Sequence, residues 1–143
     1  MKVLYDTSVL VAALLVGHSS HDKAFPLLEL AKTGDAEGYI STHSLAELYA
    51  VMTRLPDPLK VLPDEAGALI GDLMTYLKPV PLDVNDYQQA ISRLTALRLA
   101  VGVMFDAIIA QAALNTGVEH LITLNAKDFV RLGDDIAAMV MKT

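Results

Sequence analysis

Short apolar runs alternate with longer helix-like segments along the whole chain. Strands are expected where apolar or β-branched residues cluster over a few positions, at residues 2–5, 39–41, 79–82, 120–124 and 136–140. Helices are expected between them, over residues 7–15, 21–32, 43–55, from 63 onward, 84–99 and 104–115. Because strands and helices alternate, the sequence predicts the α/β class, with a central, mostly parallel sheet covered by helices on both faces.

Residue types at the predicted helix ends support these boundaries. Ser20, Thr42 and Asp83 precede helical segments, and their side chains suit the capping of free N–H groups. Gly34 and Gly117 follow helical segments, where glycine readily adopts the conformation that ends a helix. Ligands of such sheets bind outside the carboxyl ends of the strands. The polar residues that close the predicted strands are therefore the first candidates for chemistry.

Composition limits the class of protein. The 143 residues are 53% hydrophobic and contain no cysteine, which excludes disulfides, thiol nucleophiles and cysteine-bound zinc. A formal net charge of −6 provides no basic nucleic-acid footprint at the level of the whole chain. The apolar run at residues 9–16 is too short to span a bilayer, and as a signal peptide it lacks a small-residue cleavage site. We therefore expect one soluble, cytoplasmic domain over residues 1–143, with no membrane partner.

Two aspartates stand at positions where a carboxylate needs an explanation. Asp6 closes the first predicted strand, where it is either a helix cap or a functional group. Asp106 lies in residues 103–114, a helix that is apolar almost all the way round and is therefore expected to be buried. A carboxylate there is costly unless it is paired or bound to a metal. The alternative to a metal site is an ion pair with Arg93 or Arg98.

Three further polar residues follow the same logic. Glu47 points away from the main apolar face of its helix, as a solvated acid would also do. Asn125 and Asp128 follow the strand at residues 120–124, where either could form a turn or cap the next helix. All of these residues are compatible with one crevice at one end of the sheet. Because a cluster of carboxylates needs cations, we expect Mg²⁺ or Mn²⁺ there, positioned to hydrolyse a phosphodiester.

Other kinds of catalytic site find little support. The four histidines, at positions 18, 21, 43 and 120, form no metal-binding helical pair and are interpreted as loop and cap residues. No G-x-S-x-G elbow is present for a catalytic serine. The glycines form neither a G-x-G-x-x-G nor a Walker loop, which argues against mononucleotide binding.

Four short motifs together resemble the PIN-domain family and, within it, the VapC-type toxins of toxin–antitoxin modules. They are VLYDTSVL at residues 3–10, SLAEL at 44–48, FDAIIA at 105–110 and LITLNAKDF at 121–129. Each motif alone is only moderately specific, but all four in this order are strongly specific. The segment from His18 to His21 also looks like a His-rich loop that is frequent in the family.

The resemblance implies a three-layer α/β/α sandwich and a Mg²⁺- or Mn²⁺-dependent endoribonuclease. It implies that Asp6, Glu47 and Asp106 form the catalytic metal site, supported by the hydroxyls of Thr7 or Ser8. It further implies RNA as substrate, a VapB-type antitoxin as partner and a homodimer. We expect peripheral lysines and arginines to steer the RNA backbone.

The last motif departs from the family. Many members carry an acid two residues after the threonine, where this chain has Asn125, and Asp128 lies three residues further on. Asparagine can ligate through its carbonyl oxygen but brings no charge, so the number of metals stays open. Two alternatives follow: a catalytically silent PIN-like binding module, or a phosphotransfer fold. The phosphotransfer fold fits poorly because Ser8 stands where a haloacid-dehalogenase-like site needs an aspartate.

Overall fold

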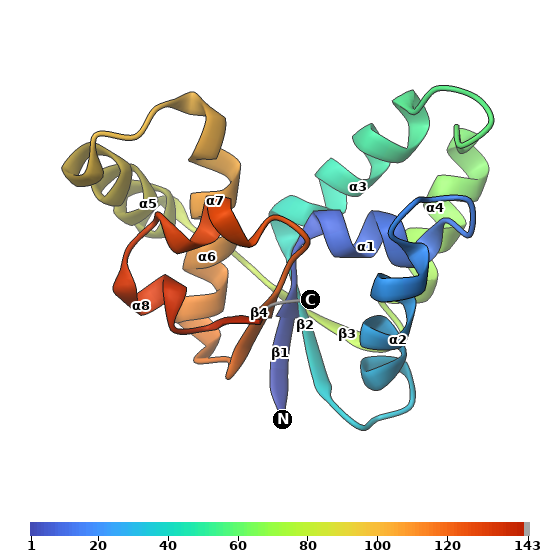
Figure 1. Ribbon diagram of the computed structural model, residues 1–143, viewed down its shortest axis with the longest axis horizontal. Coiled ribbons are helices and arrows are strands. Elements are labelled where there is room, and N and C mark those ends of the chain that lie inside the picture. Colours follow the sequence, from blue (N-terminus) through green and yellow to red (C-terminus); the bar gives the residue numbers. More distant parts are fainter. Residues whose placement is uncertain (142–143) are drawn as a thin grey trace.

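The computed structural model describes residues 1–141, apart from the side chain of Val101, as a parallel sheet between two layers of helices (Figure 1). The sheet has five strands in the order β3-β2-β1-β4-β5, and every neighbouring pair is parallel. The strands are β1 (Lys2–Tyr5), β2 (Glu37–Ser41), β3 (Leu77–Val80), β4 (His120–Ile122) and β5 (Val140–Met141). This arrangement confirms the predicted three-layer α/β/α fold.

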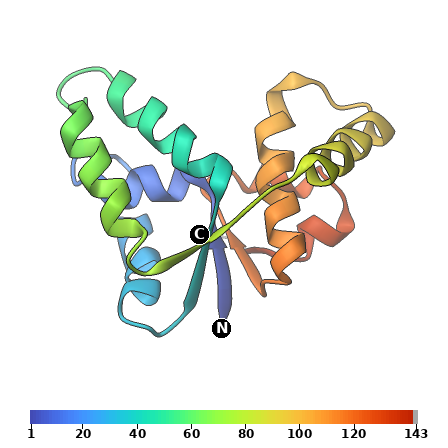
Figure 2. The ribbon, with the colours of Figure 1, turned by 180° about the vertical axis from the view of Figure 1, so that it is seen from behind.

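The first half of the chain supplies one helical layer and the second half supplies the other (Figures 1 and 2). The first layer contains α1 (Thr7–Leu14), α2 (His21–Lys32), α3 (Thr42–Arg54) and α4 (Pro63–Leu73). The second contains α5 (Val84–Leu97), the 3-10 turn η1 (Val101–Val103), α6 (Met104–Thr116), α7 (Ala126–Val130) and α8 (Asp134–Ala137). The chain passes from one layer to the other through β3, which contains Pro79 and lies at an edge of the sheet, where a proline is tolerated.

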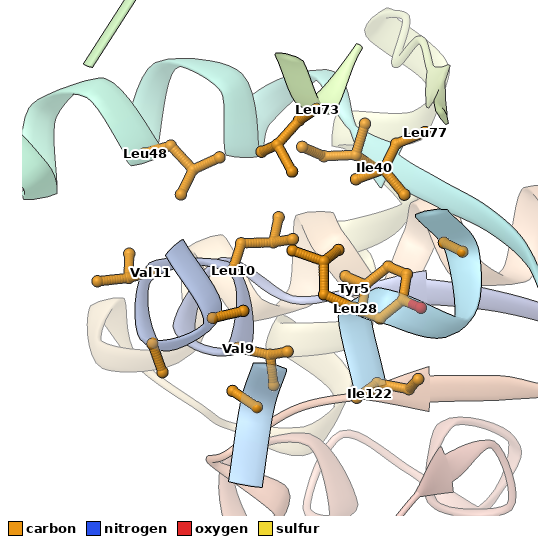
Figure 3. Close-up of a cluster of buried hydrophobic side chains, with 14 of the residues drawn as sticks. Tyr5, Val9, Leu10, Val11, Leu28, Ile40, Leu48, Leu73, Leu77 and Ile122 are labelled. Atoms are coloured by element: carbon orange, nitrogen blue, oxygen red, sulfur yellow. The ribbon is translucent and has the colours of Figure 1, made fainter. Parts of the chain in front are cut away.

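Each face of the sheet carries its own apolar core. Strand β1 sends Val3 and Tyr5 into the core beneath the first layer and Leu4 into the core beneath the second. This division follows from the alternation of side chains along a strand. Figure 3 shows Tyr5 in the first core, packed among side chains of several elements of that layer. Because β1 is buried on both sides, the residue that follows it is held firmly in place.

Helix capping agrees with the sequence in part. Asp83 caps α5 in a reciprocal capping box with Asp86, as its residue type predicts. The cap of α3 is Ser41, one residue before the expected Thr42, and its Oγ accepts from the N–H of His43 at 3.1 Å. Ser20 precedes α2 as predicted, but its side chain makes no capping hydrogen bond. The caps therefore confirm helix positions better than they confirm individual hydrogen bonds.

The last predicted strand, at residues 136–140, is wrong for most of its length. Residues Asp134–Ala137 form the short helix α8, and only Val140–Met141 pairs with β4. Two acids at the start of α8 suit a helix N-terminus, and Ile136 is fully buried on that helix. A short apolar run does not distinguish a buried helical turn from a strand. Among the described residues, no helix is long and apolar enough to cross a membrane.

Candidate active site

The carboxylates of Asp6, Glu47 and Asp106 line one cavity of about 490 Å³. Asp6 follows β1, Glu47 lies on α3, which begins where β2 ends, and Asp106 lies in the first turn of α6. The parallel topology thus brings three distant segments to the carboxyl end of the sheet, as expected for this fold. The other polar residues of the wall are Thr7, Ser8, His18, Ser20 and Asn125. Its apolar residues are Val11, Val51, Leu55 and Leu124.

Asp6 is the most buried of the three acids, with 3% of its surface exposed. Ser8 Oγ and Thr123 Oγ1 both donate to Oδ2 of Asp6, at 2.7 Å and 2.8 Å. Burial raises the pKa of Asp6, the bonds from Ser8 and Thr123 oppose that change, and the charge of Glu47 adds to it. Among the described residues, no lysine or arginine forms an ion pair with Asp6. The carboxylate is oriented by hydroxyls but has no compensating positive charge.

Glu47 is half-buried and lies beside His43, one turn earlier on α3. The His43 imidazole lowers the pKa of Glu47, against the opposing effect of partial burial. Nε2 of His43 lies 3.9 Å from Oε2 of Glu47, too far for a hydrogen bond, and has no hydrogen-bond partner in the described part of the chain. The ring of His43 stacks on Phe105, at 4.8 Å between centroids. His43 and Phe105 therefore connect the helix of Glu47 to the helix of Asp106.

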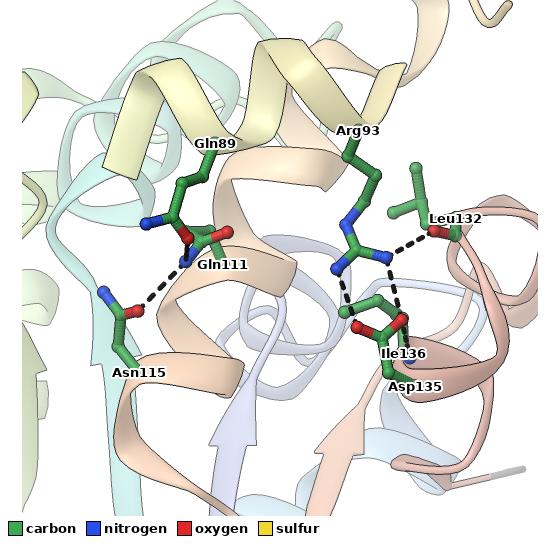
Figure 4. Close-up of polar contacts among 7 residues, drawn as sticks. All are labelled: Gln89, Arg93, Gln111, Asn115, Leu132, Asp135 and Ile136. Atoms are coloured by element: carbon green, nitrogen blue, oxygen red, sulfur yellow. Dashed lines mark hydrogen bonds and ion pairs between the residues drawn. The ribbon is translucent and has the colours of Figure 1, made fainter. Parts of the chain in front are cut away.

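Asp106 is half-buried, although most of α6 beyond it is buried as predicted. Burial raises its pKa to about 7, and the charges of Asp6, Asp128 and Glu47 add to the effect. The expected alternative, an ion pair with Arg93 or Arg98, is wrong, because among the described residues no ion pair joins Asp106 to either arginine. Arg93 instead donates to both carboxylate oxygens of Asp135, at 2.8 Å and 2.7 Å (Figure 4). Like Asp6, Asp106 is a carboxylate in a negatively charged surrounding.

Asn125 and Asp128 occupy different positions relative to the cavity. Asn125 is exposed and lines the cavity, and its backbone N–H donates to Thr123 Oγ1 at 2.9 Å. It occupies the cap position of α7, but its side chain makes no capping bond. Asp128 lies within α7, outside the cavity wall, and pairs with Arg131 at 3.7 Å. Asp128 acts on the site through its charge, whereas Asn125 can reach a ligand directly.

Thr7 and Ser8 occupy different places around Asp6. The hydroxyl of Thr7 donates to Ser44 Oγ at 2.8 Å, which joins the start of α1 to α3 near Glu47. Ser8 donates to Asp6 and accepts from the N–H of Leu124 at 3.2 Å. Both are supporting residues by geometry, because their hydroxyl protons are engaged with other side chains. They fix the walls of the cavity.

Sequence reasoning missed four polar residues of this region: Ser44, Thr123, His18 and His43. The first two lie inside the quoted motifs, but only the sheet topology shows that they face Thr7 and Asp6. The two histidines were interpreted as loop and cap residues, yet His18 lines the cavity and His43 contacts Glu47. The place of His18 in the cavity depends on the fold of its loop, which no local spacing reveals. His43, in contrast, lies four residues before Glu47 on the same helix, a spacing that could have indicated their contact.

The donor set of the cavity suits a hard divalent cation. Carboxylate, hydroxyl and amide oxygens are the ligands that Mg²⁺ and Mn²⁺ prefer. Burial raises the pKa values of Asp6 and Asp106, and the neighbouring carboxylates add to the effect, so a cation would favour their ionised forms. Among the described residues, no three acidic or histidine side chains stand close enough to form a ready-made metal site. A cation would therefore draw the carboxylates together or be bound partly through water.

Comparison with known proteins identifies the family of the chain. A sequence profile of the PIN domain matches residues 3–135. Ribonuclease VapC40 of Mycobacterium tuberculosis (strain ATCC 25618 / H37Rv) is 29% identical over 116 residues, which is 81% of each chain. The chain belongs to the PIN domain family.

Two solved structures share the fold. One is the crystal structure of VapBC2 from Rickettsia felis bound to a DNA fragment from their promoter. Its TM-score is 0.69 at 22% identity, over 99% of this chain and 98% of that one. The other is Mycobacterium tuberculosis VapC20, described as a sarcin-ricin loop cleaving toxin. Its TM-score is 0.65 at 18% identity, over 83% of this chain and 86% of that one. At these identities, the likeness confirms the α/β/α fold.

Proposed function

We propose that this protein is an endoribonuclease that depends on Mg²⁺ or Mn²⁺ and acts as the toxin of a type II toxin–antitoxin module. The observation that carries the proposal is the convergence of Asp6, Glu47 and Asp106 on one cavity, where the pKa values of both aspartates are raised. Similarity to ribonuclease VapC40 supports the choice of RNA as substrate. Membership of the PIN domain family supports the same reaction class.

In this proposal Asp6, Glu47 and Asp106 hold the cation, and Asn125 faces the same space. When bound, Mg²⁺ or Mn²⁺ would polarise the phosphodiester and the attacking water. Ser8 and Thr123 both donate to Oδ2 of Asp6, which keeps that carboxylate in one orientation and leaves Oδ1 for a ligand. The link from Thr7 to Ser44 fixes the distance between the start of α1 and the helix of Glu47.

The proposal includes a cytoplasmic location, one domain over residues 1–143, a VapB-type antitoxin and a homodimer. Large apolar side chains are exposed on or beside both helical layers, in two sets, and give the protein apolar surface for contacts with partners. The first set comprises Val16, Phe25, Tyr49 and Leu62, in or beside the first layer. The second comprises Val84, Tyr87, Ile91 and Leu97, all on α5.

A catalytically silent PIN-like binding module is the second candidate. Two observations favour it. Asn125 contributes no charge where many family members carry an acid, and the three carboxylates are not already gathered into a metal site in the described chain. Such a protein would bind RNA or a protein partner through the same cavity without cutting a phosphodiester.

Cleavage of RNA under controlled metal conditions separates the two candidates. The purified protein is incubated with random-sequence RNA and with bulk bacterial RNA, in Mg²⁺, in Mn²⁺ and in excess EDTA. We expect discrete fragments with either metal, none in EDTA, and none with the folded D106N variant. Metal-independent fragments would contradict the proposed mechanism. Intact RNA in every condition, from protein shown to be folded, would favour the silent module.

A further inference from the structure

His18 lies in the loop between α1 and α2 and contributes its side chain to the wall of the acidic cavity. The backbone around it is well held. Its N–H donates to the carbonyl of Leu15 at 2.9 Å, and its carbonyl accepts from the N–H of His21 at 3.0 Å. The imidazole is half-buried and lines the same cavity as the three acids.

The loop fixes which ring nitrogen of His18 carries a proton. The backbone N–H of Ser20 donates to Nδ1 of His18 at 3.0 Å, so Nδ1 is the acceptor and the neutral ring bears its proton on Nε2. His21 shows the opposite arrangement, because its Nδ1 lies 2.9 Å from the carbonyl oxygen of Ala12 and must donate. His21 thus anchors the loop to α1, whereas Nε2–H of His18 makes no hydrogen bond to the backbone of the described residues.

The cavity is poor in donors for an anionic ligand. The hydroxyls of Ser8 and Thr7 already donate to Asp6 and Ser44. Of the described residues that line the cavity, none is lysine or arginine. Among the described lining residues, only His18, Ser20 and Asn125 have a side-chain donor that is not already bonded to another side chain, and of these only His18 can carry a positive charge.

We propose that His18 binds the substrate phosphodiester, with Nε2–H donating to a non-bridging phosphate oxygen in the cavity. The inference rests on the proposed ribonuclease function and adds a substrate-binding residue to it. A cation held by the three carboxylates would bind part of the phosphate group, and the phosphate oxygens that it leaves unbound would need N–H or O–H donors from the protein. Hydrogen bonds to charged oxygens are stronger than hydrogen bonds between neutral groups, so one imidazole N–H contributes substantially to RNA binding.

Two substitutions separate a ligand-binding role from a role in loop shape. Asparagine at position 18 keeps an acceptor near the place of Nδ1 and removes the donor at Nε2. Glutamine at position 18 keeps a donor near the place of Nε2, because its longer side chain reaches there, and removes the acceptor for the Ser20 N–H. His120, at the amino end of β4 and paired with Val3, provides the matched control H120Q at the opposite end of the sheet.

We expect H18A and H18N to raise the KM for RNA about tenfold or more, and H18Q to recover most of that loss. The affinity for Mg²⁺, measured by calorimetry, should be unchanged in all three variants because His18 is not a metal ligand. H120Q should match the wild type. If H18N behaves as the wild type while H18Q resembles H18A, His18 only shapes the loop and the proposal is overturned. Weaker Mg²⁺ binding in H18N would overturn it as well.

Nuclear magnetic resonance of the imidazole nitrogens gives a readout that needs no RNA cleavage. With inorganic phosphate added to Mg²⁺-loaded protein, we expect a proton on Nε2 of His18 and a shift of that signal, with no shift for His120. A proton on Nδ1, or no response to phosphate, contradicts the proposal. If His18 responds but no RNA is ever cut, the ribonuclease function fails and the phosphate site stands. If RNA is cut equally well by H18N, only the His18 assignment fails.

Discussion

The hydroxyl of Thr123 donates a 2.8 Å hydrogen bond to Oδ2 of Asp6, although 117 positions separate the two residues in the chain. Strands β1 and β4 are parallel neighbours, so the residues that follow them emerge side by side. Thr123 is fully buried and Asp6 is nearly so. The bond couples the fourth motif of the family to the first and orients the most buried acid of the proposed metal site.

We expect T123V to lower both stability and activity, because the substitution removes a donor from a buried carboxylate. Loss of a hydrogen bond to a charged, buried group costs about 1–3 kcal/mol. Urea denaturation in EDTA measures the change, and T123S, which keeps the hydroxyl, is the control. Equal stability of T123V and the wild type would mean that the bond does not contribute to the fold.

D106N should abolish RNA cleavage while leaving the metal-free protein at least as stable as the wild type. The pKa of Asp106 is raised to about 7 by burial and by the charges of Asp6, Asp128 and Glu47, so the ionised form is unfavourable in the folded protein. We expect a rise in the melting temperature of about 2 °C or more near pH 8 in EDTA. A variant that unfolds more easily, or one that cleaves RNA normally, would contradict this assignment.

The stability of the metal-free protein should fall as the pH rises. The pKa of Asp106 is about 7 in the folded protein, against an ordinary value of 3.8 for an aspartate in the unfolded chain. The folded state therefore binds this proton more tightly than the unfolded state does, and the stabilisation that results is lost as the pH rises towards 8. The acids whose pKa values are lowered, Glu37, Glu47, Asp86 and Asp135, are ionised in both states above about pH 6. They therefore do not oppose the trend in this range.

Thermal melts in EDTA from about pH 6 to about pH 8 test this expectation. The wild type should lose a few degrees over the range, and saturating Mg²⁺ should reduce the loss because metal binding favours the ionised carboxylates. D106N should show a flatter profile. A wild-type melting temperature that increases steadily across the range would refute the assignment of the raised pKa.

Asn125 should matter more to the reaction than Asp128. Asn125 lines the cavity, whereas Asp128 lies in α7 and pairs with Arg131. We expect N125A to shift the Mg²⁺ dependence of cleavage and D128A to leave it close to that of the wild type. N125D adds a charge and should tighten Mg²⁺ binding. If D128A shifts the curve as much as E47A does, Asp128 replaces the missing acid.

Local patterns predicted much of this molecule. The segment Lys2–Tyr5 and the polar residues before α2 and α5 predicted elements whose first residues the structure reproduces, although α5 ends at Leu97, two residues before the expected end. Asp6 and Asp106 were identifiable as candidates because one closes a strand and the other lies on an apolar helix. Glu47 was singled out by the resemblance to the PIN-domain family, since its helical position alone also suits a solvated acid. Ile136 was misassigned because a one-turn buried helix and a short strand carry the same pattern.

Contacts between distant segments could not be predicted in the same way. The tautomer of His18 depends on a backbone N–H two residues later, and its place in the cavity depends on how the loop folds over α1. The contact of His43 with Glu47 follows helical spacing, but its stacking on Phe105 requires α3 and α6 to meet. The exposure of Asp106 likewise depends on its place at the start of α6, and not on the hydrophobicity of that helix.

The central claim is that Asp6, Glu47 and Asp106 share one cation. Titration of Mn²⁺ by electron paramagnetic resonance near pH 8 tests it without any RNA, using the wild type, D6N, E47Q, D106N and the control D128N. The account predicts saturable Mn²⁺ binding that is weakened about tenfold or more by each of the first three substitutions and little by D128N. Wild-type Mn²⁺ affinity in D6N, E47Q or D106N would contradict a cation shared by these three carboxylates.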